Sequence, residues 1–460
     1  MPWAGPATLT EPTSLPTRHA TGAPTVIVPS LPIRDRGNVP VSATLAANEA
    51  LSRRRERGEP VLPLAFGEAG LPVLPRLTAE LAGVADHGAY GPVAGAERLR
   101  AAAAGYWSRR SLPTSPEAVV AGPGSKALLF ATMLALGSDV AVPQPSWVSY
   151  AAQATLTGAT AHFVPAVPGE GGSCDPAALE AAVRASRRAG RPIGAVLVTL
   201  PDNPTGRLTR PETIRELCAV AERNDLIIIS DEIYRDLVHD PDAEVLSPAA
   251  VAPERTVVTT ALSKNLAVGG WRIGVARMPD GAAGATLRER VAGIASEIWS
   301  APAAPVQLAA AVALDEPAEV AERVARSRCL HAVVCQEAAR LCATAGLDLM
   351  APEAAFYLYP DFAPWRDSLR ARFSVRTGAD LAALLLDRYG AGTLPGSAFG
   401  ESASCLRLRL ATGLLYGDTD EQREQALAAP DPLRLPWISA AMARFGEILA
   451  DLGGLGDLAA

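Results

Sequence analysis

Short apolar segments alternate with amphipathic ones from about residue 118 onward, and this alternation limits the possible folds more than any other feature of the chain. The expected strands are residues 118–121, 140–142, 162–164, 195–200 and 226–230, and the expected helices are residues 127–136, 175–189 and 211–224. The strand segments are rich in Val, Ile and Leu and lack a polar face, as in strands that helices cover on both sides. The sequence therefore predicts an α/β fold with a mainly parallel sheet.

Several polar residues stand directly after these strands, at the edge of the sheet where ligands bind in folds of this kind. The amides of residues 122–126 open a helix and suit a phosphate, although an ordinary strand-to-helix turn has the same appearance. Trp147 can stack on a planar ring, but simple packing explains it equally well. Asn203 stands in an Asn-Pro-Thr-Gly turn. Asp231 ends an apolar strand, where a carboxylate needs a partner such as a protonated ring nitrogen.

A lysine and an arginine follow the next expected strand, residues 256–260. Lys264 stands next to Ser263 and eight residues before Arg272, which lies in a glycine-rich turn. A lysine amine condenses with aldehydes to form a Schiff base, and a guanidinium binds phosphate as a permanently charged, bidentate partner. An aldehyde that carries a phosphate describes pyridoxal 5′-phosphate. By themselves, these residues are equally compatible with a solvated loop lysine and a surface arginine.

The composition is that of a globular protein, and it argues against several classes. The 460 residues exceed what one hydrophobic core usually holds, so two domains are expected. No segment approaches the ~20 apolar residues that a membrane span needs, and a net charge of −7 gives no reason to expect nucleic acid binding. The six cysteines form no CxxC pair and the five histidines are scattered, so neither a disulfide framework nor a metal site is expected. Because the start lacks a secretory pattern, a cytoplasmic location is expected.

Together, the motifs resemble those of the class I and II aminotransferases, a family of fold-type I pyridoxal-phosphate enzymes related to aspartate aminotransferase. In family order they are Phe66-Gly67-Glu68, Tyr90 in a Tyr-x-x-x-x-Gly loop, Gly124-Ser125-Lys126, Trp147, Asn203-Pro204-Thr205-Gly206, Asp231-Glu232-Ile233-Tyr234, Ser263-Lys264 with Arg272, Pro395-Gly396-Ser397-Ala398-Phe399-Gly400, and Leu406-Arg407-Leu408. The resemblance covers about residues 42 to 430. It implies a large cofactor-binding domain at 76–304 with a sheet of the seven-stranded type, and a smaller α+β domain formed by 41–75 and 305–460. Residues 1–40 are expected to be an extended or disordered arm.

The resemblance also implies a role for each residue around the cofactor ring. Lys264 would form the Schiff base (the internal aldimine) with pyridoxal phosphate, and would then shuttle the proton between the substrate α-carbon and the cofactor. Asp231 would pair with the pyridine nitrogen, while Asn203 and Tyr234 would bond the ring oxygen. Trp147 would stack on the ring.

Further implied roles concern the phosphate and the substrate. The residues expected at the phosphate are Gly124, Ser125, Lys126, Ser263 and Arg272. Tyr90 would reach the phosphate of a neighbouring subunit, which implies a homodimer with shared active sites. Arg407 would grip the substrate α-carboxylate, with the backbone of Gly67 opposite and with Asn203 and Trp147 nearby. Arg409 is expected to face the other side of its strand as a solvated arginine.

The resemblance favours an aminotransferase that moves an amino group from an L-amino acid to a 2-oxo acid through ketimine and pyridoxamine intermediates. The alternative is a specialised-metabolism enzyme of the same fold that catalyses β- or γ-elimination, replacement or carbon–carbon bond formation. A non-catalytic cofactor-binding domain is a third alternative, which the presence of Lys264 disfavours. Departures from the family pattern leave the substrate open: they are Ala69-Gly70, Ala261, Ala354-Ala355, and Trp299-Ser300 at a position where the family lines its substrate pocket.

Overall fold

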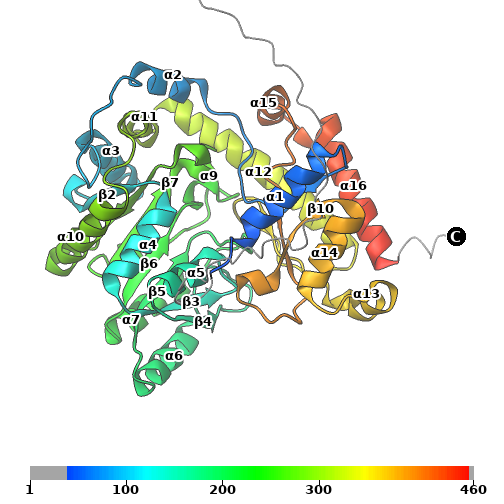
Figure 1. Cartoon of the computed structure of the whole chain (residues 1–460), viewed down its shortest axis with the longest axis horizontal. Coiled ribbons are helices and arrows are strands. Elements are labelled where there is room, and N and C mark those ends of the chain that lie inside the picture. Colours follow the sequence, from blue (N-terminus) through cyan, green and yellow to red (C-terminus); the bar gives the residue numbers. More distant parts are fainter. Residues whose placement is uncertain (1–38, 455–460) are drawn as a thin grey trace, which may run out of the picture. The chain divides into compact units, whose positions relative to one another are not determined.

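The expected mainly parallel sheet forms the centre of the structure (Figure 1), a computed structural model that describes residues 39–454. Its strands are β2 (Val119–Gly122), β3 (Asp139–Gln144), β4 (Ala161–Pro165), β5 (Ile193–Thr199), β6 (Ile227–Asp231), β7 (Thr256–Ala261) and β8 (Gly274–Arg277). They lie in the order β2-β8-β7-β6-β5-β3-β4. Only β8 runs antiparallel to its neighbours β2 and β7, and the other pairs are parallel. The predicted fold class is confirmed, with β8 as a strand that the sequence pattern did not indicate.

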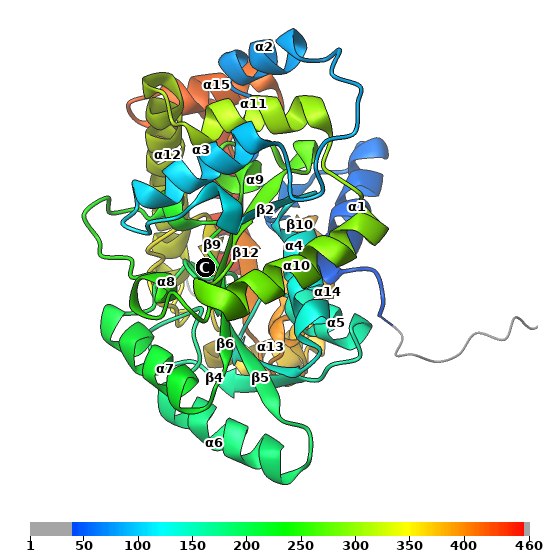
Figure 2. The same cartoon turned by 90° about the vertical axis from the view of Figure 1, so that its left-hand side faces the viewer.

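Helices cover both faces of this sheet, as the apolar strands require. The helices of this region are α2 (Pro75–Gly83), α3 (Glu97–Ser108), α4 (Ser125–Leu136), α5 (Ser149–Leu156), α6 (Pro176–Arg188), α7 (Pro211–Arg223), α8 (Pro248–Val251), α9 (Leu262–Asn265), α10 (Gly281–Ile298) and α11 (Ala304–Leu314). Consecutive residues of one strand point into different cores: Val196 of β5 packs with α6 and α7, whereas Leu197 packs with α5. Figure 2 shows α4 and α10 on one side of the sheet and α6 and α7 on the other.

Local sequence sets the ends of several of these helices. The Asp175 side chain accepts a hydrogen bond from the Ala178 amide at 2.8 Å, and Pro176 occupies the first turn of α6. Gly137 ends α4 with a φ of 64°, a left-handed conformation that glycine adopts without strain. The expected helix boundaries at residues 127–136, 175–189 and 211–224 therefore agree with α4, α6 and α7 to within two residues.

The N-terminal segment and the C-terminal third of the chain share a second group of elements. These are α1 (Ala43–Glu56), β1 (Leu62–Pro63), α12 (Ala318–Thr344), β9 (Tyr357–Leu358), α13 (Arg366–Phe373), α14 (Gly378–Tyr389), β10 (Ala391–Gly392), β11 (Leu394–Pro395), β12 (Leu408–Ala411), α15 (Asp420–Ala428) and α16 (Pro436–Gly453). The strands form an antiparallel sheet of order β11-β12-β9, and β1 pairs in parallel with β10. Leu62 and Leu64 lie in one core with residues of α12, α14 and α16, so residues from both ends of the described chain build it.

Two features of this region differ from the expected pattern. β12 begins at Leu408, so of the Leu406-Arg407-Leu408 motif only the last residue belongs to this strand. In addition, α11 packs on α2 and α3 rather than into the C-terminal core. The arm expected at residues 1–40 lies almost entirely outside the described residues. None of the helices in residues 39–454 is long and apolar enough to cross a membrane.

Candidate active site

A cavity of about 470 Å³ lies where the central strands end, and it brings most of the predicted site residues together. The predicted residues that line it are Gly67, Ser125, Lys126, Trp147, Asn203, Asp231, Tyr234, Ser263, Lys264 and Arg272. Residues that sequence reasoning did not place there also line it: Ser42, Thr44, Leu45, Glu68, Tyr150, Thr199, Tyr357 and Arg409. Among the predicted residues, Gly124 lies just outside this lining, whereas Tyr90 and Arg407 lie elsewhere.

One end of the cavity is built to receive an anion. Gly124 precedes α4 with a φ of 84°, and a Cβ atom at this position would lie 2.5 Å from Arg272 Nη2. The Arg272 guanidinium donates only to backbone carbonyls, of Gly269 at 2.9 Å and of Pro123 at 3.3 Å. Lys126 stands beside it, and burial together with the Arg272 charge lowers the pKa of the Lys126 amine. Two cations at a helix N-terminus, with no acidic partner in residues 39–454, form an anion site.

Lys264 is buried in the middle of the cavity. It lies on the short helix α9, directly after β7, and its Nζ donates a hydrogen bond to the carbonyl oxygen of Gly67. Burial, and next the positive charge of Arg409, lowers the pKa of Lys264 to about 8. A lysine with this pKa is partly neutral near pH 7, which makes its amine a nucleophile and a base.

Asp231 ends β6 as a buried carboxylate at the floor of the cavity. It accepts hydrogen bonds from the Tyr150 hydroxyl at 3.0 Å and from Thr259 Oγ1 at 3.2 Å. Burial raises its pKa to about 6, and no cation of residues 39–454 pairs with it. Such a carboxylate fits a ligand that carries a positive charge on a buried nitrogen. The sequence showed Tyr150 within the segment after β3 but gave no signal for its contact with Asp231.

A chain of hydrogen bonds joins four residues that line the cavity. Arg409 Nη1 donates to Asn203 Oδ1 at 3.3 Å, and Asn203 Nδ2 donates to the Tyr234 hydroxyl at 3.3 Å. The Tyr234 hydroxyl in turn lies 2.7 Å from the hydroxyl of Tyr357. Trp147 packs edge-to-face on Tyr150 at 5.2 Å between ring centroids, and the Lys126 amine lies 5.0 Å from the Trp147 ring.

The structure reverses the expected positions of the two arginines of the Leu406–Leu410 segment. Arg407 was expected to face the substrate, but its guanidinium lies outside the cavity and pairs with Asp361 at 3.1 Å and Glu401 at 2.6 Å. Arg409 was expected to be solvated, but it is 1% exposed and lines the cavity. Two residues that are two apart in one strand point to the same side, so opposite orientations of Arg407 and Arg409 could not be expected from a continuous strand. The two differ because only Arg409 belongs to β12, whereas Arg407 precedes it in an isolated bridge with Asp361.

Two aromatic residues noted in the sequence do not contribute to this cavity. Tyr90 is 92% exposed. Trp299 lines a separate, mainly apolar hollow with Phe130, Leu156 and Ile298, next to Lys126 and Arg272. Trp299 therefore does not line the cavity around Lys264, contrary to the expectation from its position in the sequence.

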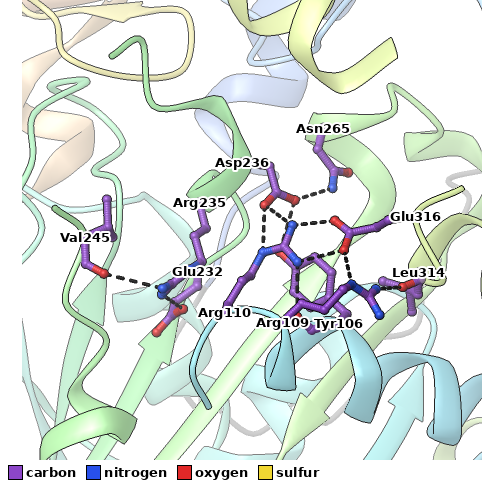
Figure 3. Close-up of polar contacts among 10 residues, drawn as sticks. All are labelled: Tyr106, Arg109, Arg110, Glu232, Arg235, Asp236, Val245, Asn265, Leu314 and Glu316. Atoms are coloured by element: carbon purple, nitrogen blue, oxygen red, sulfur yellow. Dashed lines mark hydrogen bonds and ion pairs between the residues drawn. The ribbon is translucent and has the colours of Figure 1, made fainter. Parts of the chain in front are cut away.

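A partly buried ionic network contacts the turn that carries Lys264, through its neighbour Asn265 (Figure 3). Asn265, the residue after Lys264, donates to Asp236 at 2.8 Å. Arg110 pairs with Asp236 at 2.7 Å and with Glu316 at 2.5 Å, and the Tyr106 hydroxyl donates to Asp236 at 3.0 Å. The network therefore joins α9, the segment after β6, the end of α3 and the link between α11 and α12. No motif in the sequence pointed to it.

Comparisons with known proteins agree on one family. The sequence profile of the family "Aminotransferase class I and II" matches residues 67–429. The aspartate aminotransferase of Geobacillus stearothermophilus is 29% identical over 391 residues, which cover 83% of this chain and 95% of that protein. The aspartate/prephenate aminotransferase of Thermus thermophilus is 30% identical, over 74% of this chain and 89% of that protein. The solved structure of aspartate aminotransferase from Thermus thermophilus with maleate superposes with a TM-score of 0.73 at 27% identity, covering 85% of this chain and 96% of that one.

The family profile spans well over half of the chain, and the relatives align over most of their own length. The predicted fold, family, cofactor and enzyme class are therefore confirmed. This chain belongs to the class I and II aminotransferases, enzymes that use pyridoxal phosphate to transfer amino groups.

Proposed function

We propose that the cavity around Lys264 is the active site, and that Arg409 holds the α-carboxylate of the amino acid or 2-oxo acid. The observation that carries this proposal is that Arg409 is fully buried without a carboxylate partner in residues 39–454. Its hydrogen-bond partners there are the Asn203 side chain and the Ala65 carbonyl oxygen. Burying an unpaired guanidinium is costly unless a ligand supplies the missing negative charge. Because Arg409 and Lys264 line the same cavity, a carboxylate on Arg409 places the neighbouring carbon near the lysine amine.

The donor set of the cavity supports pyridoxal phosphate as the resident group. Arg272, Ser263 and the amides at the start of α4 would hold its phosphate. Asp231 would hold its pyridine nitrogen, which explains a buried carboxylate without a cationic partner. The remaining expected contacts are Asn203 and Tyr234 at the ring oxygen and Trp147 at the ring face. When bound, the cofactor withdraws electrons from the carbon that carries the amino group and stabilises negative charge there.

Three residues of the chain then have separate roles in the reaction. Asp231 keeps a proton on the nitrogen beside it, because the positive charge relieves the cost of its own burial. Lys264 Nζ takes the proton from the substrate α-carbon and holds it on its amine, for which a pKa of about 8 is suited near neutral pH. Arg409 fixes the α-carboxylate and so the orientation of the bond that breaks. The relatives described above are all named aminotransferases, which favours amino transfer over elimination or replacement.

We further propose that the substrates include an amino acid with a second carboxylate. Two of the relatives act, by their names, on aspartate. In this chain Lys126 also lines the cavity. Arg272 is held in place without it, so the positive charge of Lys126 is available for a second carboxylate of the substrate. The Lys126→Met variant tests this: kcat/KM for aspartate falls far more than kcat/KM for a monocarboxylic amino acid. An equal fall for both would instead support the role expected from the sequence, contact with the cofactor phosphate.

A homodimer with shared active sites is also proposed, with Tyr90 reaching the partner's phosphate. Its support is the 92% exposure of Tyr90, a large aromatic side chain, and the exposed apolar hollow around Leu156, Ile298 and Trp299. Mixing Lys264→Ala with Tyr90→Phe subunits tests it. A mixed dimer regains one complete site, so activity rises on mixing; a monomeric enzyme shows no recovery.

The division into domains and the location remain proposals. The two groups of cores support a large domain at 76–304 and a smaller one at 41–75 and 305–460, with α11 attached to the large domain by its packing. The six cysteines, all free thiols, favour the reducing cytoplasm.

The visible spectrum of the purified protein tests the central proposal. With added pyridoxal phosphate, the native chain shows an absorption band that Lys264→Ala lacks. An L-amino acid converts this band, and a 2-oxo acid restores it. A protein that takes up the cofactor but returns to its first spectrum without any oxo acid would point to elimination or replacement.

A further inference from the structure

We propose that Tyr357 is a positioning residue of this active site, which directs the hydrogen bond that Tyr234 donates into the cavity. The inference rests on the proposed contact between Tyr234 and the ring oxygen of the cofactor. The two hydroxyl oxygens lie 2.7 Å apart, and the rings meet edge-to-face with centroids 5.4 Å apart. Both side chains are buried, and both line the cavity.

The direction of the hydrogen bonds follows from Arg409. A guanidinium can only donate, so the Asn203 atom that faces it at 3.3 Å is the oxygen, and the Asn203 amide nitrogen faces Tyr234. The Tyr234 hydroxyl therefore accepts one hydrogen bond from Asn203. If Tyr234 donated its single proton to Tyr357, it would have none for a ligand. Only when Tyr357 donates to Tyr234 is the Tyr234 proton free to point into the cavity.

Burial keeps both hydroxyl groups protonated, against the nearby positive charge of Arg409. Burial raises the pKa of Tyr234 and of Tyr357. The charged groups that face them are Arg409 on β12, whose guanidinium lies 5.1 Å from the Tyr357 ring, Asp231 on β6, and Lys264 and Glu68 across the cavity. From α12, the Cys335 thiol lies 3.5 Å from the Tyr357 carbonyl, and burial raises its pKa to about 12, so it adds no charge.

Gly67 makes the position of Tyr357 possible. A Cβ atom at residue 67 would overlap the Tyr357 hydroxyl. The family resemblance implied that the Gly67 backbone faces the substrate, and in the structure the Tyr357 hydroxyl also lies against this glycine. Alanine at this position would push the hydroxyl away from Tyr234 without requiring an unusual backbone conformation, because the φ of Gly67 is not in the left-handed region.

The function of this arrangement is to strengthen the Tyr234 donor. A hydroxyl group that accepts two hydrogen bonds becomes a better donor, by roughly 10–30% of the bond energy. A stronger bond to the ring oxygen of the cofactor stabilises the form of the cofactor that has lost its proton, and so lowers the pKa at which its visible absorption titrates. Loss of the Tyr357 hydroxyl should therefore raise that pKa.

The test is a spectral pH titration of the holoenzyme without substrate. Tyr357→Phe is expected to raise the pKa of the visible band by roughly 0.2–0.6 pH units. Tyr234→Phe should raise it more, and the double variant should match Tyr234→Phe, because Tyr357 acts only through Tyr234. Gly67→Ala should shift the band in the same direction as Tyr357→Phe. The matched control is Tyr359→Phe, since the Tyr359 hydroxyl donates to Glu401 at 2.6 Å, and Tyr359 does not line the cavity.

The possible results distinguish a failure of the proposed role of Tyr357 from a failure of the proposed contact between Tyr234 and the cofactor. If Tyr234→Phe shifts the band and Tyr357→Phe does not, Tyr357 has only a packing role. If the two single shifts add in the double variant, Tyr357 acts independently of Tyr234 and the inference is wrong. If Tyr234→Phe leaves the band unchanged, the proposed contact of Tyr234 with the cofactor fails instead. Thermal unfolding of each variant shows whether a shift reflects a loss of folding.

Discussion

Replacing Arg409 by methionine should remove most of the transaminase activity, whereas the same change at Arg407 should leave it nearly intact. The two arginines are separated by one residue, and the change in side chain is identical. Arg409 faces the cavity with no carboxylate partner, while Arg407 is 43% exposed and already paired with Asp361 and Glu401. The pair of variants therefore compares the two candidate carboxylate ligands directly.

The size of the effect follows from the bond that Arg409 would make. Two charge-assisted hydrogen bonds to a carboxylate are worth about 1.5–3 kcal/mol each. Their loss from the transition state lowers kcat/KM by roughly two to four powers of ten. Arg409→Lys keeps the positive charge but loses the bidentate geometry, so it should recover part of the lost activity. Arg407→Met should change kcat/KM less than about threefold, because a half-exposed ion pair contributes little.

The assay is steady-state transamination at saturating pyridoxal phosphate, with kcat and KM determined for both the amino acid and the oxo acid. Binding of an unreactive carboxylic acid, followed through its effect on the visible spectrum, reports the same contact without chemistry. Thermal unfolding controls for loss of fold, because Arg409 also holds Asn203 and the Ala65 carbonyl. If Arg409→Met kept kcat/KM within threefold of the native value while Arg407→Met lost it, the assignment from the structure would be wrong.

Three further predictions concern ionisable groups. In the cofactor-free protein, the rate of reaction with pyridoxal phosphate should rise with pH through about 8 and then level off, since the neutral Lys264 amine is the reactive form; stopped-flow absorbance measures it, and a profile centred near 10.5 would contradict the burial of the amine. Burial raises the Asp231 pKa from 3.8 to about 6, so this group makes the folded apoprotein less stable as the pH rises through that window. Asp231→Asn should therefore stabilise the apoprotein by roughly 1–3 kcal/mol at pH 7 and not at pH 4, as measured by urea unfolding, while weakening cofactor binding. Arg110→Met leaves the partly buried Asp236 and Glu316 carboxylates without their shared cation and should lower the free energy of unfolding by about 1.5–3 kcal/mol, whereas Arg53→Met, at an exposed pair with Glu49, should have no measurable effect.

The sequence predicted the architecture well because it depends on local patterns. Apolar runs without a polar face, such as residues 195–200 and 226–230, can only be strands covered on both sides, and their order along the chain sets a parallel sheet. Residues that directly follow those strands, such as Asn203 and Asp231, were brought to one cavity for the same reason.

What the sequence could not provide are the contacts made by residues distant along the chain. Arg407 and Arg409 have similar neighbours in sequence, and only Asp361 and Glu401, which hold Arg407 outside the cavity, decide between them. Tyr357 belongs to a two-residue strand, and its place beside Tyr234 depends on a core cluster that joins Tyr234 and Leu237 to Phe356 and Ala411. The contacts of Asp236 likewise depend on segments that are apart in the sequence, since Arg110 lies 126 residues before it and Asn265 lies 29 residues after it.

The residues that hold the Lys264 turn in place are different from the residues that line the cavity. The turn that carries the lysine is tied through Asn265 and Asp236 to Arg110 and Glu316, none of which lines the cavity. The wall formed by Ser42, Thr44, Leu45 and Glu68 belongs to different elements. Changes to these cavity-lining residues therefore leave in place the contacts that hold Asn265, the residue next to Lys264.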